Sequence, residues 1–190
     1  MPMNLFYENI PEMINVAGCD IPIITDFREH IKLIDMLNDD SVLPTEKYYF
    51  IMQYFKEKPP DFLDALDKLI DFVMMTEMQE EYEEQTEEDA GRRKPLYSFK
   101  VDYPYIFSAF LSEYGINLRK VPYLHWWEFK MLFDGLPEKT EIKQRIMYRS
   151  IDTGAIKDKD ERKRIEKIQR AIRLPEAVPT DYDIGDAFEW

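Results

Sequence analysis

Two adjacent tryptophans in one short predicted helix place the strongest constraint on how this chain can fold. Trp126 and Trp127 lie within the run 124–137, which ends with Gly135 and a Leu-Pro pair. Glycine can take the left-handed conformation that ends a helix, and a proline after it prevents continuation. Neighbouring residues are about 100° apart around a helix, so one narrow stripe cannot bury both indoles. Either the helix is enclosed on two sides, or one indole is a contact surface.

The composition indicates a globular, mostly helical protein. Of the 190 residues, 45% are hydrophobic and 14% aromatic, which excludes wholesale disorder. Six glycines against ten methionines favour helix. The single cysteine, Cys19, excludes an internal disulfide and a cysteine-cluster metal site. Neither a signal-like N-terminus nor a long apolar run is present, so we expect a cytoplasmic protein without a membrane role.

The charge is divided unevenly along the chain. Residues 1–90 carry 22 acidic and 6 basic residues, whereas residues 91–190 carry 16 acidic and 19 basic residues. An acidic front half and a mildly basic back half suggest two modules, complementary to each other or to neighbouring subunits; ordinary solvated faces are the other interpretation. The overall charge of −13 argues against double-stranded nucleic acid as a partner.

The hydrophobic pattern predicts a mainly α protein, with about six helices in two modules and a small N-terminal β-hairpin. The hairpin would pair residues 13–16 with 21–24 around a turn at 17–20, which contains Cys19. Helices are expected to begin at the caps Thr25, Asp61 and Thr140, and near Pro44, Pro104, Pro122 and Asp158. We expect a helical module over 1–76, an acidic linker over 77–98, a second module over 99–175 and an acidic tail over 176–190. The predicted core includes Phe27, Phe107, Phe110, Trp127 and Met131.

No pattern of residues predicts catalysis or a cofactor. The two histidines, His30 and His125, fall in different predicted modules, and no ligand spacing accompanies them. We expect His125 to be a hydrogen-bonded residue at a helix start. Nucleophile elbows and glycine-rich phosphate loops are absent from the sequence. The basic zone over 145–170, which includes Arg162 and Arg164, could meet phosphate, meet an acidic protein surface, or form helical ion pairs with interleaved acids.

Several segments together resemble a family of tailed-bacteriophage proteins labelled the gene-product-fifteen family, known from phages and prophages of Gram-positive hosts. The aromatic block 124–137 is the most specific of them. The others are Thr25-Asp26-Phe27-Arg28, Tyr103-Pro104-Tyr105-Ile106 with Ala109-Phe110, Tyr148-Arg149-Ser150-Ile151-Asp152 and Asp158-Lys159-Asp160-Glu161-Arg162. The resemblance spans roughly residues 13–175.

The resemblance implies a gene in the tail-morphogenesis cluster, near that of the tape-measure protein, where tail assembly chaperones are commonly encoded. Such a protein would bind the tape-measure protein, with the major tail protein as a second candidate partner. It would self-associate, act in the host cytoplasm, and be absent from the mature virion. A structural role in the virion, as a tail-completion or head–tail joining component, is the alternative. Candidate partner contacts are the flexible Met74, Met75 and Met78 and the charged Arg162 and Arg164. Trp126 is a further candidate, with burial in the core as the alternative.

Overall fold

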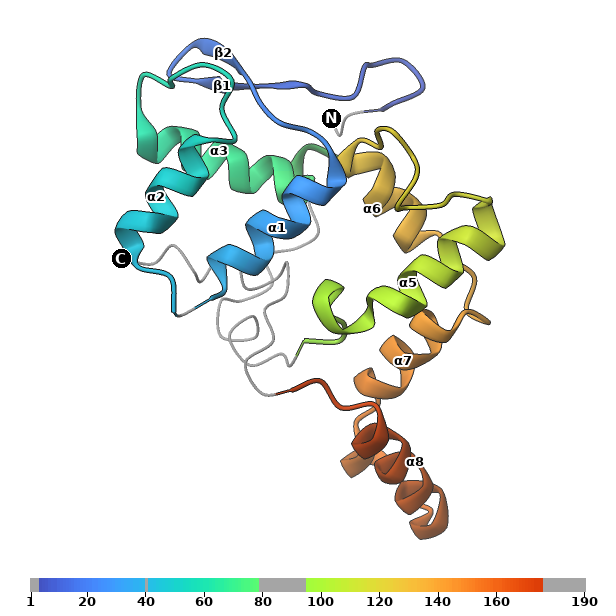
Figure 1. Cartoon of the computed structure of the whole chain (residues 1–190). Helices are drawn as coiled ribbons and strands as arrows, with labels where there is room; N and C mark the ends of the chain where they lie inside the picture. Colours follow the sequence, from blue (N-terminus) through green and yellow to red (C-terminus); the bar gives the residue numbers. More distant parts are fainter. Residues whose placement is uncertain (1–3, 40, 79–94, 176–190) are drawn as a thin grey trace. The chain divides into compact units, whose positions relative to one another are not determined.

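The computed structural model describes residues 4–39, 41–78 and 95–175 (Figure 1). These residues form seven α-helices and one two-stranded antiparallel sheet, which confirms the prediction of a mainly helical protein with an N-terminal hairpin. The helices are α1 (Phe27–Leu37), α2 (Pro44–Met52), α3 (Phe62–Met74), α5 (Phe99–Tyr114), α6 (Trp126–Asp134), α7 (Glu141–Ser150) and α8 (Lys159–Ala171). Two short 3-10 turns, η1 (Thr76–Met78) and η2 (Thr153–Ala155), complete the described elements.

The described residues divide into two compact units. Unit 1 contains residues 4–39, 41–78 and 123–130, and unit 2 contains residues 95–122 and 131–175. The predicted second module was expected to hold the whole Trp-Trp helix. Instead, the first five residues of α6 belong to unit 1 and the last four to unit 2. Most of the predicted linker and all of the predicted tail lie outside the described residues.

The hairpin pairs β1 (Met13–Val16) with β2 (Cys19–Pro22). The turn is only two residues long, because Ala17 and Gly18 both have positive φ angles, 49° and 82°. This geometry is typical of the primed turns that match the twist of paired strands. The second strand therefore begins two residues earlier than predicted, and Cys19 is an exposed strand residue rather than part of the turn.

Helices α1 and α3 form the core of unit 1 together with the hairpin. The cap of α1 is Asp26, whose carboxylate accepts from the N–H of Arg28; the prediction of Thr25 as cap was wrong by one residue. Asp61 caps α3 as predicted. Helix α3 buries Leu66, Leu69, Phe72 and Val73, at the 3–4 residue spacing of one helical face.

The spacing of apolar residues after Pro44 predicts a helix that stops at Pro59-Pro60 and has Tyr48 on its inward face. Helix α2 instead ends at Met52, and its buried residue is Ile51. Tyr48 is 39% exposed.

In unit 2, α5 begins at Phe99, earlier than the predicted start near Pro104. Ser98 is its cap, accepting from the N–H of Val101, and Pro104 lies inside the helix. The helix ends at Gly115, whose φ of 69° is a left-handed conformation that favours glycine. Asp158 caps α8 by accepting from two backbone N–H groups, in agreement with the predicted start near Asp158.

Candidate interaction surface

Both adjacent tryptophans are buried, and they cap another helix. The indole N–H of Trp126 donates to the carbonyl of Val73 at 2.9 Å, and that of Trp127 donates to the carbonyl of Phe72 at 2.8 Å. These carbonyls belong to the last turn of α3, where four C=O groups lack partners within the helix. The two indoles are 0% and 1% exposed. The enclosed arrangement is therefore the correct one of the two alternatives, and Trp126 presents no surface to a partner.

His125 holds the start of α6. Its Nδ1 accepts from the N–H of Trp127 at 3.0 Å, and its Nε2 donates to the carbonyl of Pro11 at 3.1 Å. The carboxylate of Glu128 accepts from the N–H of His125 at 3.2 Å, which completes a reciprocal capping box. Burial lowers the pKa of His125 and keeps the ring neutral. The prediction of a hydrogen-bonded helix-start residue is confirmed.

His30 belongs to the same unit and is completely buried. Its Nε2 donates to the carbonyl of Ile24 at 2.8 Å, while Nδ1 has no hydrogen-bond partner in the described part of the chain. Rings of Tyr54, Phe72 and Trp126 surround it, with centroids 5.3–5.9 Å away. Burial lowers the pKa of His30 to about 4. A neutral imidazole thus fills an aromatic pocket, and the prediction that the two histidines occupy different modules was wrong.

The other predicted core residues differ in how far they are buried. Phe27 and Phe110 are buried, and Phe27 stacks on Phe129 with centroids 4.7 Å apart. Phe107 and Met131 are only half-buried.

The end of α6 also differs from its prediction. Gly135 does not take a left-handed conformation. A Cβ at this position would lie 3.2 Å from the carbonyl oxygen of Met131 and 3.5 Å from the hydroxyl of Tyr114, so the close approach of these groups favours glycine.

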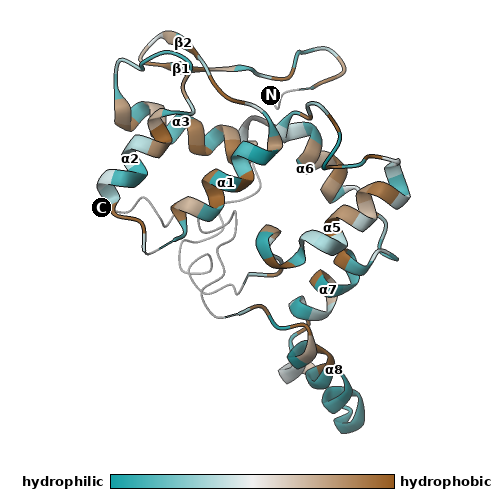
Figure 2. Cartoon of the chain, in the orientation of Figure 1, coloured by the Kyte–Doolittle hydropathy of each residue, from teal (hydrophilic) through white to brown (hydrophobic). Residues whose placement is uncertain are grey.

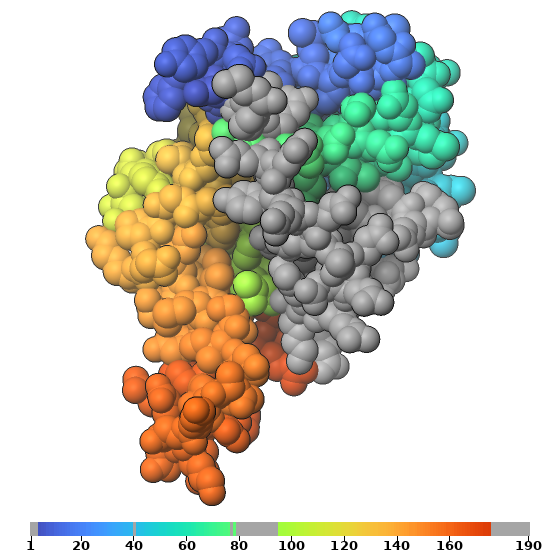
Figure 3. All heavy atoms as spheres, turned by 180° about the vertical axis from the view of Figure 1, so that it is seen from behind, coloured from blue at the N-terminus to red at the C-terminus, as the bar shows by residue number. Residues whose placement is uncertain are grey.

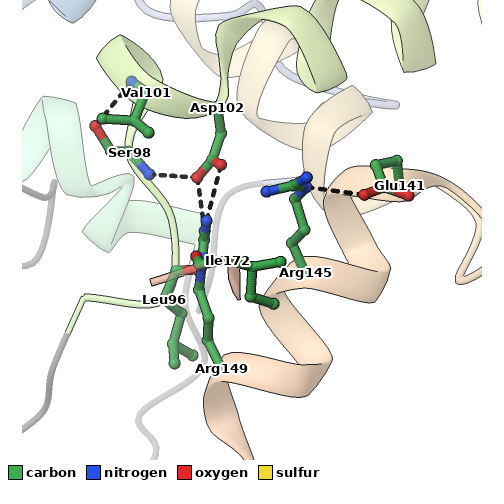
Figure 4. A network of polar contacts seen from close by, with 8 residues as sticks. All are labelled: Leu96, Ser98, Val101, Asp102, Glu141, Arg145, Arg149 and Ile172. Atoms are coloured by element: carbon green, nitrogen blue, oxygen red, sulfur yellow. Dashed lines mark hydrogen bonds and ion pairs between the residues drawn. The ribbon is translucent and has the colours of Figure 1, made fainter. Parts of the chain in front are cut away.

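Unit 2 is held together by a buried ion pair (Figure 4). Arg149 of α7 donates to both carboxylate oxygens of Asp102 in α5, at 2.7 and 3.0 Å, and the two side chains are 7% and 0% exposed. Arg149 also donates to the carbonyls of Leu96 and Ile172, each at 2.9 Å. The N–H of Ser98 donates to the same carboxylate at 3.0 Å. One guanidinium therefore joins α7 to the start of α5 and the end of α8.

Helix α2 carries an unusual exposed apolar surface. Tyr48, Tyr49 and Phe50 are 39%, 69% and 47% exposed, and Tyr48 packs on Phe62 of α3 with centroids 4.5 Å apart. Leu43 and Leu63 are 61% and 65% exposed. We call these residues (Leu43, Tyr48, Tyr49, Phe50 and Leu63) the aromatic surface. Large exposed apolar side chains on and beside one short helix are candidates for a contact site.

A family model for the Bacteriophage Gp15 protein matches residues 6–174. The chain belongs to this family. Its match covers both units, so the Trp-Trp cap of unit 1 and the Asp102–Arg149 pair of unit 2 are parts of one Gp15 family protein. Comparisons with curated proteins and with solved structures give no significant match.

The predicted partner contacts of this Gp15 family protein fall in three places. Met74, Met75 and Met78 are half-buried where α3 ends, and Met75 takes the left-handed conformation there, with φ 57°. Arg162 donates through its guanidinium to the carbonyl of Ile156. Arg164 is exposed on α8. The three methionines and the aromatic surface belong to unit 1, and the two arginines belong to unit 2.

Sequence reasoning missed the aromatic surface. The run Tyr48-Tyr49-Phe50-Ile51-Met52 occupies all sides of a short helix, and such a run is typical of a helix that is either fully enclosed or has an unfilled contact face.

Two further observations concern the described residues. No three His, Cys, Asp or Glu side chains among them gather closely enough to hold a metal ion. None of their helices combines the length and apolar character needed to cross a membrane.

Proposed function

We propose that this Gp15 family protein is a non-enzymatic tail assembly chaperone that binds the tape-measure protein during tail morphogenesis. The major tail protein is a second candidate partner. Membership of the family indicates an association with bacteriophages. The specific role in tail assembly is inferred from the resemblance of the sequence to proteins encoded in the tail-morphogenesis cluster. The proposal places the protein in the host cytoplasm and leaves it out of the mature virion.

The observation that carries the proposal is the aromatic surface on α2. A chaperone must offer apolar contact area while free, because its client arrives with apolar surface of its own. Tyr49, at 69% exposed, and Phe50, at 47%, provide such area on a helix that buries only Ile51. Tyrosine and phenylalanine have few rotatable bonds, so they lose little conformational entropy on binding. An amphipathic helix of a long helical client can pack against such a surface.

The charge of the chain supports the same role. A net charge of −13 in 190 residues opposes self-aggregation and keeps a complex with an insoluble client in solution. The three methionines at the end of α3 would add adaptable contacts once a client is bound.

Co-expression with the tape-measure protein encoded beside this gene tests the proposal. We expect the tape-measure protein to become soluble and to co-purify, with several copies of this chain per client by size-exclusion chromatography and light scattering. Tyr49→Ser together with Phe50→Ser should abolish co-purification. Tyr103→Ser with Leu111→Ser is the matched control, because those residues of unit 2 are exposed to a similar extent, 66% and 45%; this variant should still bind.

Two results would contradict the proposal. One is a tape-measure protein that stays insoluble and unbound beside a well-folded wild-type chain. The other is stoichiometric recovery of this chain from purified particles, which would indicate a structural component such as a tail-completion or head–tail joining protein.

A further inference from the structure

Helix α8 presents a row of cations on its outer face. Lys159, Lys163, Lys167 and Arg170 are spaced by four, four and three residues, so they lie along one side of the helix, and all four are exposed. The opposite side, with Ile165 and Gln169, packs chiefly on α7 and η2. Figure 2 shows α8 largely in the teal of hydrophilic residues. In the space-filling view the atoms of α7 and α8, orange to red, lie open at the surface (Figure 3). We call these four residues the basic row.

The basic row differs from three arginines of unit 2 whose guanidinium groups have partners. Arg149 is buried against Asp102, Arg145 pairs with Glu141 at 2.9 Å and lies 3.7 Å over the ring of Tyr105, and Arg162 donates to a backbone carbonyl. The side chains of the basic row make no hydrogen bond or ion pair with another residue that the structure describes. The ion pairs with interleaved acids of the same helix, one of the three interpretations of this basic zone, therefore do not form at these four side chains.

Unit 1 carries a surface of opposite sign. An open hollow of about 1060 Å³ lies between the segment 9–15 and α3. The hollow is lined by three acidic residues, Glu12, Asp20 and Asp71, and by one basic residue, Lys68. The Nζ of Lys68 lies 3.5 Å from the Oδ2 of Asp71. Asp67, exposed on the same helix as Asp71, adds a further negative charge beside the hollow. We call Glu12, Asp20, Asp67 and Asp71 the acidic rim.

We propose that the basic row of one chain docks on the acidic rim of a second copy. The two charge sets have opposite sign: four cations in the basic row face four carboxylates and one lysine, Lys68, at the acidic rim. The basic row extends over roughly 16 Å at the helical rise per residue. Duplex DNA is the weaker candidate, because a chain with 22 acids and 6 bases in its first 90 residues would repel the phosphate backbone. The two patches are different surfaces, so the contact is head-to-tail and forms either a ring or an open array. This inference does not rest on the proposed function, since it concerns the chain alone.

Sedimentation velocity of the full chain, over a range of protein and NaCl concentrations, tests the inference. We expect oligomers at low salt that dissociate as salt rises, because exposed charge pairs are screened. Lys163→Glu, Lys167→Glu and Arg170→Glu together should give a monomer. The matched control, Lys100→Glu, Arg119→Glu and Lys120→Glu, makes the same charge change at exposed positions of unit 2 and should leave the oligomer intact.

A mixing experiment shows whether the contact is between chains. Asp20→Lys, Asp67→Lys and Asp71→Lys together should also give a monomer, and this variant mixed with the α8 variant should associate again. The inference is overturned if the wild type is monomeric throughout, or if the control variant dissociates as fully as the α8 variant. It is equally overturned if the α8 substitutions leave the oligomer intact while abolishing salt-sensitive binding of a 20-base-pair duplex, which would assign the basic row to nucleic acid.

Discussion

Unit 1 and unit 2 bury polar groups in two different ways. Unit 1 uses neutral donors: two indoles satisfy carbonyls at the end of α3, and a neutral imidazole, His30, lies among aromatic rings. Unit 2 buries a full ion pair, Asp102 with Arg149, with further hydrogen bonds around it. A neutral group left without its partner costs about 1–3 kcal/mol, whereas a buried charge left alone costs more. The two units should therefore respond differently when a single partner is removed.

The largest effect is expected in unit 2, from Arg149→Met. The substitution leaves the carboxylate of Asp102 buried without its counter-charge, which should lower the free energy of unfolding by about 3–5 kcal/mol. Urea denaturation measures the loss, and hydrogen exchange of α5 and α7 amides should locate it in unit 2. Adding Asp102→Leu should recover most of the stability, because no unpaired charge then remains. A loss below about 1 kcal/mol for the single variant would mean that water or another group solvates Asp102.

In unit 1, Trp127→Ala should cost a similar amount, about 3–5 kcal/mol, since it removes a large buried ring as well as a hydrogen bond. Trp127→Phe keeps most of the ring and loses only the donor to Phe72, so about 1–3 kcal/mol is expected. Hydrogen exchange at the end of α3 reports both variants. Equal losses for the two substitutions would show that the hydrogen bond, and not the volume, dominates.

The next largest effect is expected for the change in the stability of unit 1 with pH. The pKa of His30 is about 4 in the folded chain and about 6.5 when unfolded, so the unfolded state takes up the proton first as pH falls. Neutral His30 thus contributes about 3 kcal/mol to the free energy of unfolding. This contribution is complete above pH 6.5 and is lost as the pH falls toward 4. Urea denaturation at pH 7 and pH 4.5 should show a smaller difference for His30→Leu than for the wild type. Identical differences would mean that the folded chain also protonates His30 near pH 6.5.

The smallest effect on stability is expected at the aromatic surface. Tyr49→Ser in unit 1 and Tyr103→Ser in unit 2 should each change the free energy of unfolding by no more than about 0.5 kcal/mol, because both side chains are largely exposed. Thermal denaturation checks this for each variant. A loss above about 1 kcal/mol for Tyr49→Ser alone would indicate that Tyr49 stabilises α2, and would weaken its assignment as a contact residue.

Local signals predicted much of this fold. The predictions of Asp61 and Asp158 as caps and of His125 as a helix-start residue each depend on residues close together in the chain. The turn at Ala17-Gly18 was harder to predict, since alanine rarely adopts a positive φ and the sequence Gly-Cys-Asp allowed a longer loop.

The errors arise where distant segments decide the structure. Nothing near Trp126 in the sequence indicates that its indole reaches Val73, 53 residues earlier. Asp102 and Arg149, 47 residues apart, each look like ordinary surface charges when taken alone. The start of α5 was predicted too late because Pro104 suits the first turn of a helix. In the structure the N–H of Ser98 donates to the buried carboxylate of Asp102, so Ser98 is the cap and the helix begins earlier. The family resemblance identified the block that contains the tryptophans without indicating what they contact.

The indole caps on α3 also have a consequence for the order of events on the ribosome. The carbonyls of Phe72 and Val73 are synthesised 53–55 residues before the tryptophans that cap them. At bacterial translation rates this interval is roughly 3–10 seconds. During this interval the nascent chain contains the residues of α1 and α3 but not yet Trp126, so the aromatic pocket around His30 is incomplete. A nascent chain arrested before residue 123 should therefore be digested by protease within α3, whereas one arrested far enough past residue 130 for that residue to leave the exit tunnel should be protected there.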